Sequence, residues 1–340
     1  MSRRVDVIIP CHNRSDLTAI TLRNVLLAEG VVLQVFAVDD GSSDDTLELL
    51  GSFGDPRLRV HHFETPRGAS SARNYGFLQG DAPYVCFLDS DDLMHPEKLC
   101  RQIDLLESHG DKDLAVCQMG HFEHDPNQSE LLWNTFFGGD PKVRFLMHDA
   151  VWGMHAPLWR RSALDRVAAS RGNPMVLDDS LPMAQDYELH ARALALGLKP
   201  ILTSELLCFC RQHSGPSIGS SKKIKRYETL MQVFESLKPL ATTKGEAING
   251  NYWWIATLAA IQGQTSIMET ALAQAKGTTW RFRLFCQLAA MSKRHRFFAW
   301  ARAEALKQGH DLKVREDWHS RHRVDAEPGL KRFEMPPGSF

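Results

Sequence analysis

The sequence has 340 residues, which is long enough for one large domain and a smaller one. Hydrophobic residues make up 43% and charged residues 24%, the balance of a globular protein rather than a disordered chain. The 40 lysines and arginines nearly cancel the 41 aspartates and glutamates. A chain without a global positive field has no general attraction for nucleic acid, so we expect no nucleic-acid partner.

The start of the chain and its cysteines indicate a location. Residues 1–6 run directly into a strand-like segment, and no stretch approaches the ~18 unbroken apolar residues of a membrane-spanning helix. The seven cysteines have neither the arrangement of a disulfide framework nor a zinc spacing. Cys208 and Cys210 would share one face of a strand, where buried thiols are favoured over a redox pair. These features predict a cytoplasmic protein.

The first hundred residues alternate between strand-like and helix-like patterns. Strands are predicted at 5–10, 33–38, 57–63 and 83–88, and helices at 15–29, 44–50, 68–78 and 96–109. This alternation predicts right-handed βαβ crossovers, and therefore an α/β fold with a mostly parallel central sheet flanked by helices. Ligands of such sheets bind outside the carboxyl ends of the strands. Acidic residues lie at those ends here, which predicts a binding site at that edge.

The later part of the chain has a different pattern. Residues 113–209 mix strands with a helix near 187–196. Helices are then predicted at 224–237, 247–263, 266–275 and 281–308. We therefore predict a larger α/β domain over 1–220, a smaller helical region over 221–310, and an irregular tail over 311–340.

A cluster of carboxylates follows the fourth predicted strand. Asp89, Asp91 and Asp92 lie within four residues of sequence. Carboxylate oxygens are the ligands that Mg²⁺ or Mn²⁺ prefers, and acids gathered this tightly repel one another unless a cation is present. A helix cap accounts for one of them and not for all three. The cluster therefore favours a metal site.

Two further motifs leave alternatives open. Asp39, Asp40 and Gly41 end the second predicted strand, where a carboxylate can accept a hydrogen bond from a nucleobase, but the same residues also build ordinary turns. Gly68 begins a run of small residues that leads to Arg73. Small residues allow a phosphate to approach a helix N-terminus, and they equally allow a helix to pack closely on a sheet.

Taken together, the motifs resemble those of the family 2 glycosyltransferases. The resemblance rests on Pro10-Cys11-His12-Asn13-Arg14, Val38-Asp39-Asp40-Gly41-Ser42, Gly68 to Gly76, Phe87-Leu88-Asp89-Ser90-Asp91-Asp92, Ala184-Gln185-Asp186-Tyr187-Glu188-Leu189 and Arg211-Gln212-His213-Ser214. It covers roughly residues 3–220. It implies a GT-A fold and the inverting transfer of a sugar from a nucleoside diphosphate, with a uridine diphosphate sugar favoured, to a hydroxyl group of a growing glycan or lipid-linked saccharide.

The resemblance also implies a role for individual residues. The donor would be bound by Pro10, His12, Asn13, Asp40, Gly68, Arg73 and Asp89. In that set Asp40 and His12 would contact the base and Asp89 the ribose. Asp91 would bind Mg²⁺ or Mn²⁺, and His213 would be a second metal or diphosphate contact.

The general base implied by the resemblance is Asp186. The family usually has Glu-Asp at this point, whereas this chain has Gln185 before Asp186. The carboxylate in the base position is retained, so the chemistry remains feasible. For Glu188, which would face elsewhere on the helix, we favour a structural role.

A basic and aromatic stretch lies at 279–302. Such a helix can bind an anionic membrane surface, which would make the protein peripheral at the inner face of a membrane, but a domain helix with its aromatic residues inward is favoured. Two other functions stay open: a sugar nucleotidyltransferase, and a catalytically inactive nucleotide-sugar-binding homologue. A dehydrogenase is disfavoured because no Gly-x-Gly-x-x-Gly follows the first strand.

Overall fold

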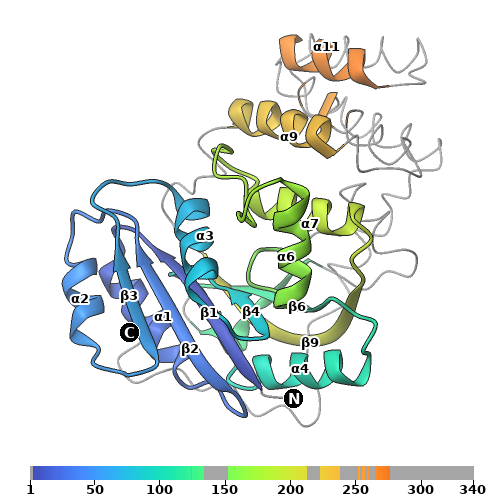
Figure 1. Ribbon diagram of the computed structural model, residues 1–340. Coiled ribbons are helices and arrows are strands. Elements are labelled where there is room, and N and C mark those ends of the chain that lie inside the picture. The colour runs from blue at the N-terminus through green and yellow to red at the C-terminus, as the bar shows by residue number, and fades with distance from the viewer. Residues whose placement is uncertain are drawn as a thin grey trace. The chain divides into compact units, whose positions relative to one another are not determined.

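The structure is a computed structural model in which two compact units can be distinguished (Figure 1). It describes residues 3–123, 125–133, 152–212, 223–237, 252, 255–256, 259 and 265–275. The first unit holds the described residues up to 212, and the second holds those from 223 onward. Within these residues, no helix combines the length and the apolar composition that crossing a membrane requires.

One half of the central sheet is parallel, as the sequence predicts. β3 (Leu58–His62), β2 (Val32–Asp39), β1 (Arg4–Cys11) and β4 (Tyr84–Phe87) lie side by side in this order and run parallel. They are connected by α1 (Ser15–Val25), α2 (Thr46–Ser52) and α3 (Ala69–Gln79). All of β1 after its first residue is buried, because helices cover both faces of the sheet.

In the other half the pairing is mixed rather than mostly parallel. The sheet continues from β4 through β8 (Pro157–Arg160), β6 (Leu114–Phe122), β9 (Pro200–Arg211) and β5 (Leu93–Met94), and β7 (Glu130–Trp133) pairs with β6. β8 is antiparallel to both of its neighbours, while β9 is parallel to β6. A parallel neighbour needs a crossover that returns the chain to the same end of the sheet, whereas an antiparallel neighbour does not. β8 is followed at once by α6 (Arg161–Ser170).

The two faces of β1 pack against different helices. Val7 and Ile9 belong to a core formed with α1, α2 and α4 (Lys98–Ser108). Ile8 points to the opposite face, where α3 packs so closely that a Cβ on Gly76 would lie 2.6 Å from the Ile8 Cγ2 atom. Close packing on the sheet thus requires at least this small residue of the motif that begins at Gly68.

The second unit contains helices where the sequence predicts them. α9 (Lys223–Leu237) and α11 (Thr265–Gln274) match the predictions at 224–237 and 266–275. Tyr252 packs edge-on against Phe234 of α9, and its hydroxyl donates to Glu235 at 2.5 Å. Most of the helix predicted at 247–263, the helix at 281–308, the basic stretch at 279–302 and the tail lie outside the described residues. The domain boundaries at 220 and 310 stay predictions.

A buried ion cluster fixes α7 (Gln185–Ala195). Glu188, which is 1% exposed, accepts from the Arg192 Nε atom at 2.6 Å and also pairs with Arg171, which follows α6. Both guanidinium groups are more than nine-tenths buried. The carboxylate of Glu188 is therefore fully used in joining α7 to the end of α6, as expected for a structural residue.

We predict that Glu188→Ala lowers the free energy of unfolding by about 3–5 kcal/mol, because removal of one member of a buried ion cluster leaves uncompensated charge. Urea denaturation measures the change. The matched control is Asp81→Ala, which removes the partner of Arg4 from an exposed ion pair, and such pairs contribute at most about 1 kcal/mol. Equal, small losses in the two variants would contradict the structural role of Glu188.

Candidate active site

The carboxyl ends of β1 and β2 are joined by polar side chains. Asp40 is 6% exposed, and its two carboxylate oxygens accept backbone N–H groups of Arg67 at 2.6 Å and Gly68 at 2.8 Å. Gly41 follows with φ +67°, and a Cβ there would lie 2.8 Å from the ring of Pro66. Asp40 thus ties the end of β2 to the loop that leads into α3. The carboxylate that the resemblance assigns to the nucleobase is used by the fold as well.

His12 and Asn13 lie in the loop after Pro10, which is itself buried in β1. The exposed His12 contacts the backbone oxygen of Asp40 through Nδ1 at 2.8 Å. Asn13 adopts a left-handed φ of 50°, and its side-chain oxygen accepts the backbone N–H of Ser43 at 2.7 Å. The loops after β1 and β2 therefore form one hydrogen-bonded surface beside Asp40.

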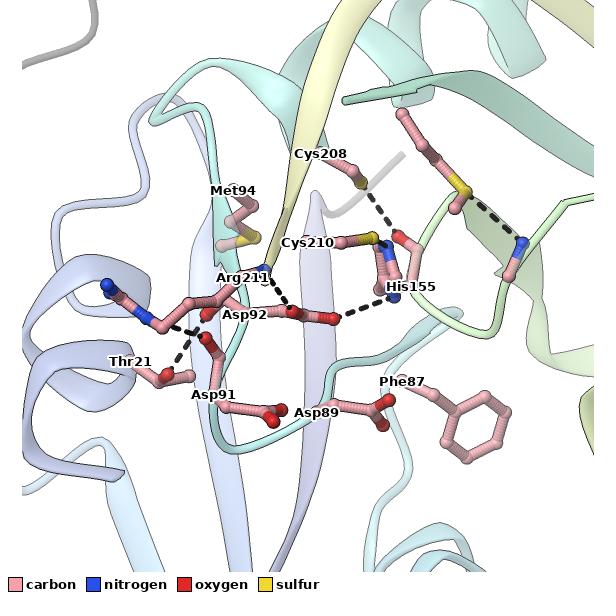
Figure 2. Close-up of polar contacts among 12 residues, drawn as sticks. Thr21, Phe87, Asp89, Asp91, Asp92, Met94, His155, Cys208, Cys210 and Arg211 are labelled. Atoms are coloured by element: carbon pink, nitrogen blue, oxygen red, sulfur yellow. Dashed lines mark hydrogen bonds and ion pairs between the residues drawn. The ribbon is translucent and has the colours of Figure 1, made fainter. Parts of the chain in front are cut away.

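Three carboxylates gather in the loop after β4 (Figure 2). One oxygen from each of Asp89, Asp91 and Asp92 lies within 4.8 Å of the others. The Asp89 and Asp91 side chains point to the same side of the loop in Figure 2, whereas Asp92 points toward β9. The clustering expected from the sequence is present at the predicted edge of the sheet.

Two arginines neutralise part of this charge. Arg73, which is 6% exposed on α3, pairs with Asp89, and Arg14, from the loop after β1, pairs with Asp91. Although desolvation opposes the ionisation of Asp89, the guanidinium groups of Arg73 and Arg14 hold its pKa below the usual value. Asp89 is therefore a carboxylate at neutral pH. Asp89 and Asp91 thus meet Arg73 from α3 and Arg14 from the loop after β1. Of these four residues, all except Arg14 were predicted as site residues.

Asp92 is in a different electrostatic position from its neighbours. It is 6% exposed, and burial together with the nearby charges of Asp91 and Asp89 raises its pKa well above the usual value. Its Oδ1 accepts the backbone N–H of Arg211 at 3.0 Å, and its Oδ2 lies 3.3 Å from the Nδ1 of His155. Burial lowers the pKa of His155 to about 4, so this imidazole is neutral at physiological pH.

Asp186 is the second residue of α7 and thus lies on a different element from the acidic loop. Its Oδ1 accepts the backbone N–H of Tyr187 at 2.8 Å in the first helical turn. The segment that leads to α7 is tied to α3, because the Asn74 side chain accepts the backbone N–H of Leu177 at 2.9 Å and donates to its carbonyl at 2.9 Å. Asn74 directly follows Arg73, so one helix anchors the approach to Asp186 and also carries the partner of Asp89. The convergence of Asp186 on Asp91 itself stays a prediction.

Two residues near the acidic loop were not predicted from the sequence, and one predicted residue lies outside the described part of the chain. His213, predicted as a metal or diphosphate contact, is outside the described residues. No role was predicted for Arg14, although it lies inside the first motif. His155 carries no local signal at all, since it comes 63 residues after Asp92 and precedes β8 in a region of mixed pattern. Pairing of distant strands brings it to the acidic loop.

The donor set of the acidic loop fits a hard divalent cation. Asp89 and Asp91 offer carboxylate oxygens, and Mg²⁺ and Mn²⁺ are commonly held by one or two carboxylates together with phosphate oxygens and water. The nearby Arg73 and Arg14 supply positive charge of the kind that pairs with phosphate. The chemistry that this edge of the sheet can support is therefore the binding of a diphosphate group together with a cation.

A comparison with protein families shows what this part of the chain is similar to. Residues 6–166, just under half of the chain, match the family described as glycosyl transferase family 2. The match begins within β1 and includes the loops with Asp40 and the acidic cluster as well as His155.

Two relatives match this chain over part of its length. The chain is 27% identical over 202 residues to the succinoglycan biosynthesis protein ExoO of Rhizobium meliloti, covering 57% of this chain and 56% of that protein. It is 29% identical over 208 residues to the succinoglycan biosynthesis protein ExoU of the same organism, covering 57% and 58%. The chain thus matches somewhat more than half the length of these relatives.

Solved structures share the fold, which is of the GT-A type. The structure of S. aureus TarS 1–349 in complex with UDP-GlcNAc is similar with a TM-score of 0.59 at 15% identity, covering 90% of this chain and 92% of that one. The mannosyltransferase PcManGT from Pyrobaculum calidifontis, in complex with GDP-Man and Mn²⁺, is similar with a TM-score of 0.56 at 18% identity, covering 93% and 88%. The GT-A fold predicted from the motifs is confirmed.

We predict that Asp40→Asn lowers the free energy of unfolding by about 1–3 kcal/mol, since an amide NH₂ would face one of the two buried N–H donors and leave it unsatisfied. Thermal and urea denaturation measure the loss. Asp165→Asn, at an exposed position of α6, is the control and should change stability little. If both variants were as stable as the parent protein, the anchoring of the loop before α3 by Asp40 would be disproved.

Proposed function

We propose that this protein is an inverting glycosyltransferase that moves a sugar from a nucleoside diphosphate donor to a hydroxyl group of a saccharide acceptor. The observation that carries the proposal is the acidic loop, in which Asp89, Asp91 and Asp92 offer oxygens within 4.8 Å of one another in the part of the chain that matches family 2. Complexes of structural neighbours with UDP-GlcNAc and with GDP-Man and Mn²⁺ support a nucleotide-sugar donor and a divalent ion.

The residues at this edge divide the binding of the donor between them. His12 and Asp40 lie where the loops after β1 and β2 meet, and we assign them to the base. We assign Asp89 to the ribose and Arg73 to the diphosphate, with Pro10, Asn13 and Gly68 shaping the surface. Asp91 would hold Mg²⁺ or Mn²⁺, with His213 as a further contact. The ion supplies positive charge against the developing charge of the departing diphosphate, a contribution of several kcal/mol.

Asp186 is our candidate for the general base. Its carboxylate lies in the first turn of α7, near the positive end of the helix dipole. An aspartate of ordinary pKa near ~3.9 is a weak base, so the acceptor proton moves late, as the oxygen bonds to the anomeric carbon. A single displacement needs no covalent intermediate, and holding donor and acceptor in line provides much of the acceleration.

The acceptor and the location are proposed more coarsely. The names of the relatives ExoO and ExoU, which concern succinoglycan biosynthesis, support a growing polysaccharide or lipid-linked saccharide as acceptor. We propose a cytoplasmic protein, with residues 279–302 as the segment to examine for peripheral membrane contact. A panel of nucleotide sugars, screened for nucleotide release with Mn²⁺ or Mg²⁺, would identify the donor.

Two single substitutions test the division of labour. We expect Asp186→Asn to lower the transfer rate by about 10²- to 10⁴-fold while binding of UDP with Mn²⁺ stays unchanged, because only the proton acceptor is lost. We expect Asp91→Asn to weaken Mn²⁺-dependent UDP binding itself. Isothermal titration and a coupled nucleotide-release assay measure both, with Asp165→Asn as the control. Weakened UDP binding in Asp186→Asn, or full transfer activity, would refute its role as base.

The stereochemistry of the product provides a separate test of mechanism. A single displacement inverts the anomeric centre, so an α-linked donor should give a β-linked product. The anomeric proton coupling in the NMR spectrum of the isolated product determines the configuration. Retention of configuration would rule out direct attack assisted by Asp186.

A further inference from the structure

Asp92 differs from the other two carboxylates because contacts within the fold occupy both of its oxygens. Oδ1 accepts the backbone N–H of Arg211 on β9, and Oδ2 faces His155. Its backbone is held as well: the carbonyl oxygen accepts the Thr21 hydroxyl at 2.9 Å, and the N–H donates to the Asp89 carbonyl at 3.2 Å. Asp92 is therefore the point at which the acidic loop is fastened to the sheet.

His155 makes two hydrogen bonds with cysteines of β9, and its Nδ1 faces the acidic loop (Figure 2). Its Nε2 lies 2.9 Å from the Cys210 Sγ atom, and its backbone oxygen accepts the Cys208 thiol at 3.0 Å. Its Nδ1 lies 3.3 Å from Asp92, and the residue is 4% exposed. The imidazole thus bridges β9 and the acidic loop, which come from distant parts of the sequence.

We propose that His155 is a positioning residue that, together with Cys210, holds Asp92 and thereby keeps Asp89 and Asp91 at the separation that receives the divalent cation. The inference rests on the proposed function, since it concerns the cation of that same site. The physical reason is the repulsion among three carboxylates within 4.8 Å, which would spread an unfastened loop. Asp92 serves as the anchor, and the cation is left to Asp89 and Asp91.

The test compares variants that keep or lose one of the two imidazole contacts. His155→Asn places an amide group where Nδ1 stands and should keep the contact with Asp92, whereas His155→Leu loses both contacts. We expect His155→Leu to bind Mn²⁺ about 10- to 100-fold more weakly than the parent protein, the range found for groups that support a metal site without binding the metal, and His155→Asn to recover most of that loss. Electron paramagnetic resonance of free Mn²⁺ measures the affinity without any turnover.

Cys210 offers a second pair of variants. Cys210→Ser retains a group that can hydrogen-bond with Nε2, and Cys210→Val removes it at similar volume. We expect Mn²⁺ affinity to fall in Cys210→Val and to be largely preserved in Cys210→Ser. Equal affinities in Cys210→Val and the parent protein would show that the contact between the thiol and the imidazole does not position the loop.

A matched control separates positioning from general damage to the core. His190 on α7 is also fully buried, with its ring stacked on Trp159 at 5.8 Å between centroids. We expect His190→Leu, which removes a buried imidazole of α7 instead of the one that faces Asp92, to change Mn²⁺ affinity by less than about twofold. If His190→Leu and His155→Leu weakened Mn²⁺ binding equally, His155 would have only a structural role.

Amide hydrogen exchange tests the positioning role of His155 independently of whether the protein binds Mn²⁺. His155→Leu should speed amide exchange in the peptide with Asp89 to Asp92, and His190→Leu should not, with or without Mn²⁺. If the parent protein failed to bind Mn²⁺ while this difference in exchange was seen, the proposed cation would fail and the positioning role would stand. Unchanged exchange in His155→Leu would overturn the positioning role.

The same side chains could instead hold a soft metal, since one donor atom from each of Asp92, His155 and Cys210 lies within 4.8 Å of the others. Titration with Cd²⁺ distinguishes the two cases, because a bound thiolate gives a charge-transfer absorption in the ultraviolet. We expect no such band. A band in the parent protein that is lost in Cys210→Ser would overturn the positioning role and identify a metal site.

Discussion

Mutual repulsion of carboxylates is the constraint around which the edge of this sheet is organised. Three acids lie within four residues in the loop after β4, and the surrounding structure offsets the charge of each in a different way. Asp89 and Asp91 face arginines that arrive from α3 and from the loop after β1, whereas Asp92 is buried, with a pKa raised well above the usual value. Two charges are thus kept and paired, and the third is removed from the solvent. A cation added here would meet paired carboxylates rather than bare ones.

Because those carboxylates already have partners, cation binding and the two arginines are coupled. A divalent ion at Asp91 would compete with the Arg14 guanidinium, whose side chain is 41% exposed and free to reorient. Arg73 is far more buried, so its contact with Asp89 is the more permanent one. An arginine displaced from Asp91 would remain next to the site and would be attracted to a diphosphate. Arg14 and Arg73 therefore place positive charge where a diphosphate group could bind.

Much of the fold was predictable because it is encoded locally. In the first hundred residues, the period of the apolar residues and the capping and turn residues locate β1 to β4 and α1 to α4 to within a few positions, and βαβ chirality then places the acidic loop. The two-residue strand β5 was not predicted. The mixed half of the sheet depends on pairings between distant segments, such as β8 with β4 and β9 with β6, for which no local pattern exists. His155 belongs to that half. Its role could not be inferred from sequence because its partners are chosen by strand pairing.

The motif residues also show why a resemblance cannot by itself assign roles. Asp40 and Asn13 carry the expected side chains, yet both make hydrogen bonds that join loops of the fold. A nucleobase could contact only the donor and acceptor groups of these side chains that those hydrogen bonds leave available. A residue can therefore match a family motif because the fold needs its hydrogen bonds, without any contact with a ligand. The ion pairs of Asp89 with Arg73 and of Asp91 with Arg14 differ, because they involve charges that a ligand could rearrange.

The replacement of the usual glutamate by Gln185 has a structural explanation of the same kind. The Gln185 side-chain amide donates to the Leu181 carbonyl at 3.0 Å, a bond that an ionised glutamate cannot make because it has no proton to donate. Glu188, one turn further on, is neutralised by two buried arginines and adds no free charge. An aspartate of ordinary pKa is a weak base. If Asp186 is the base, catalytic proton transfer would depend on how closely the acceptor hydroxyl is held rather than on the basicity of the aspartate.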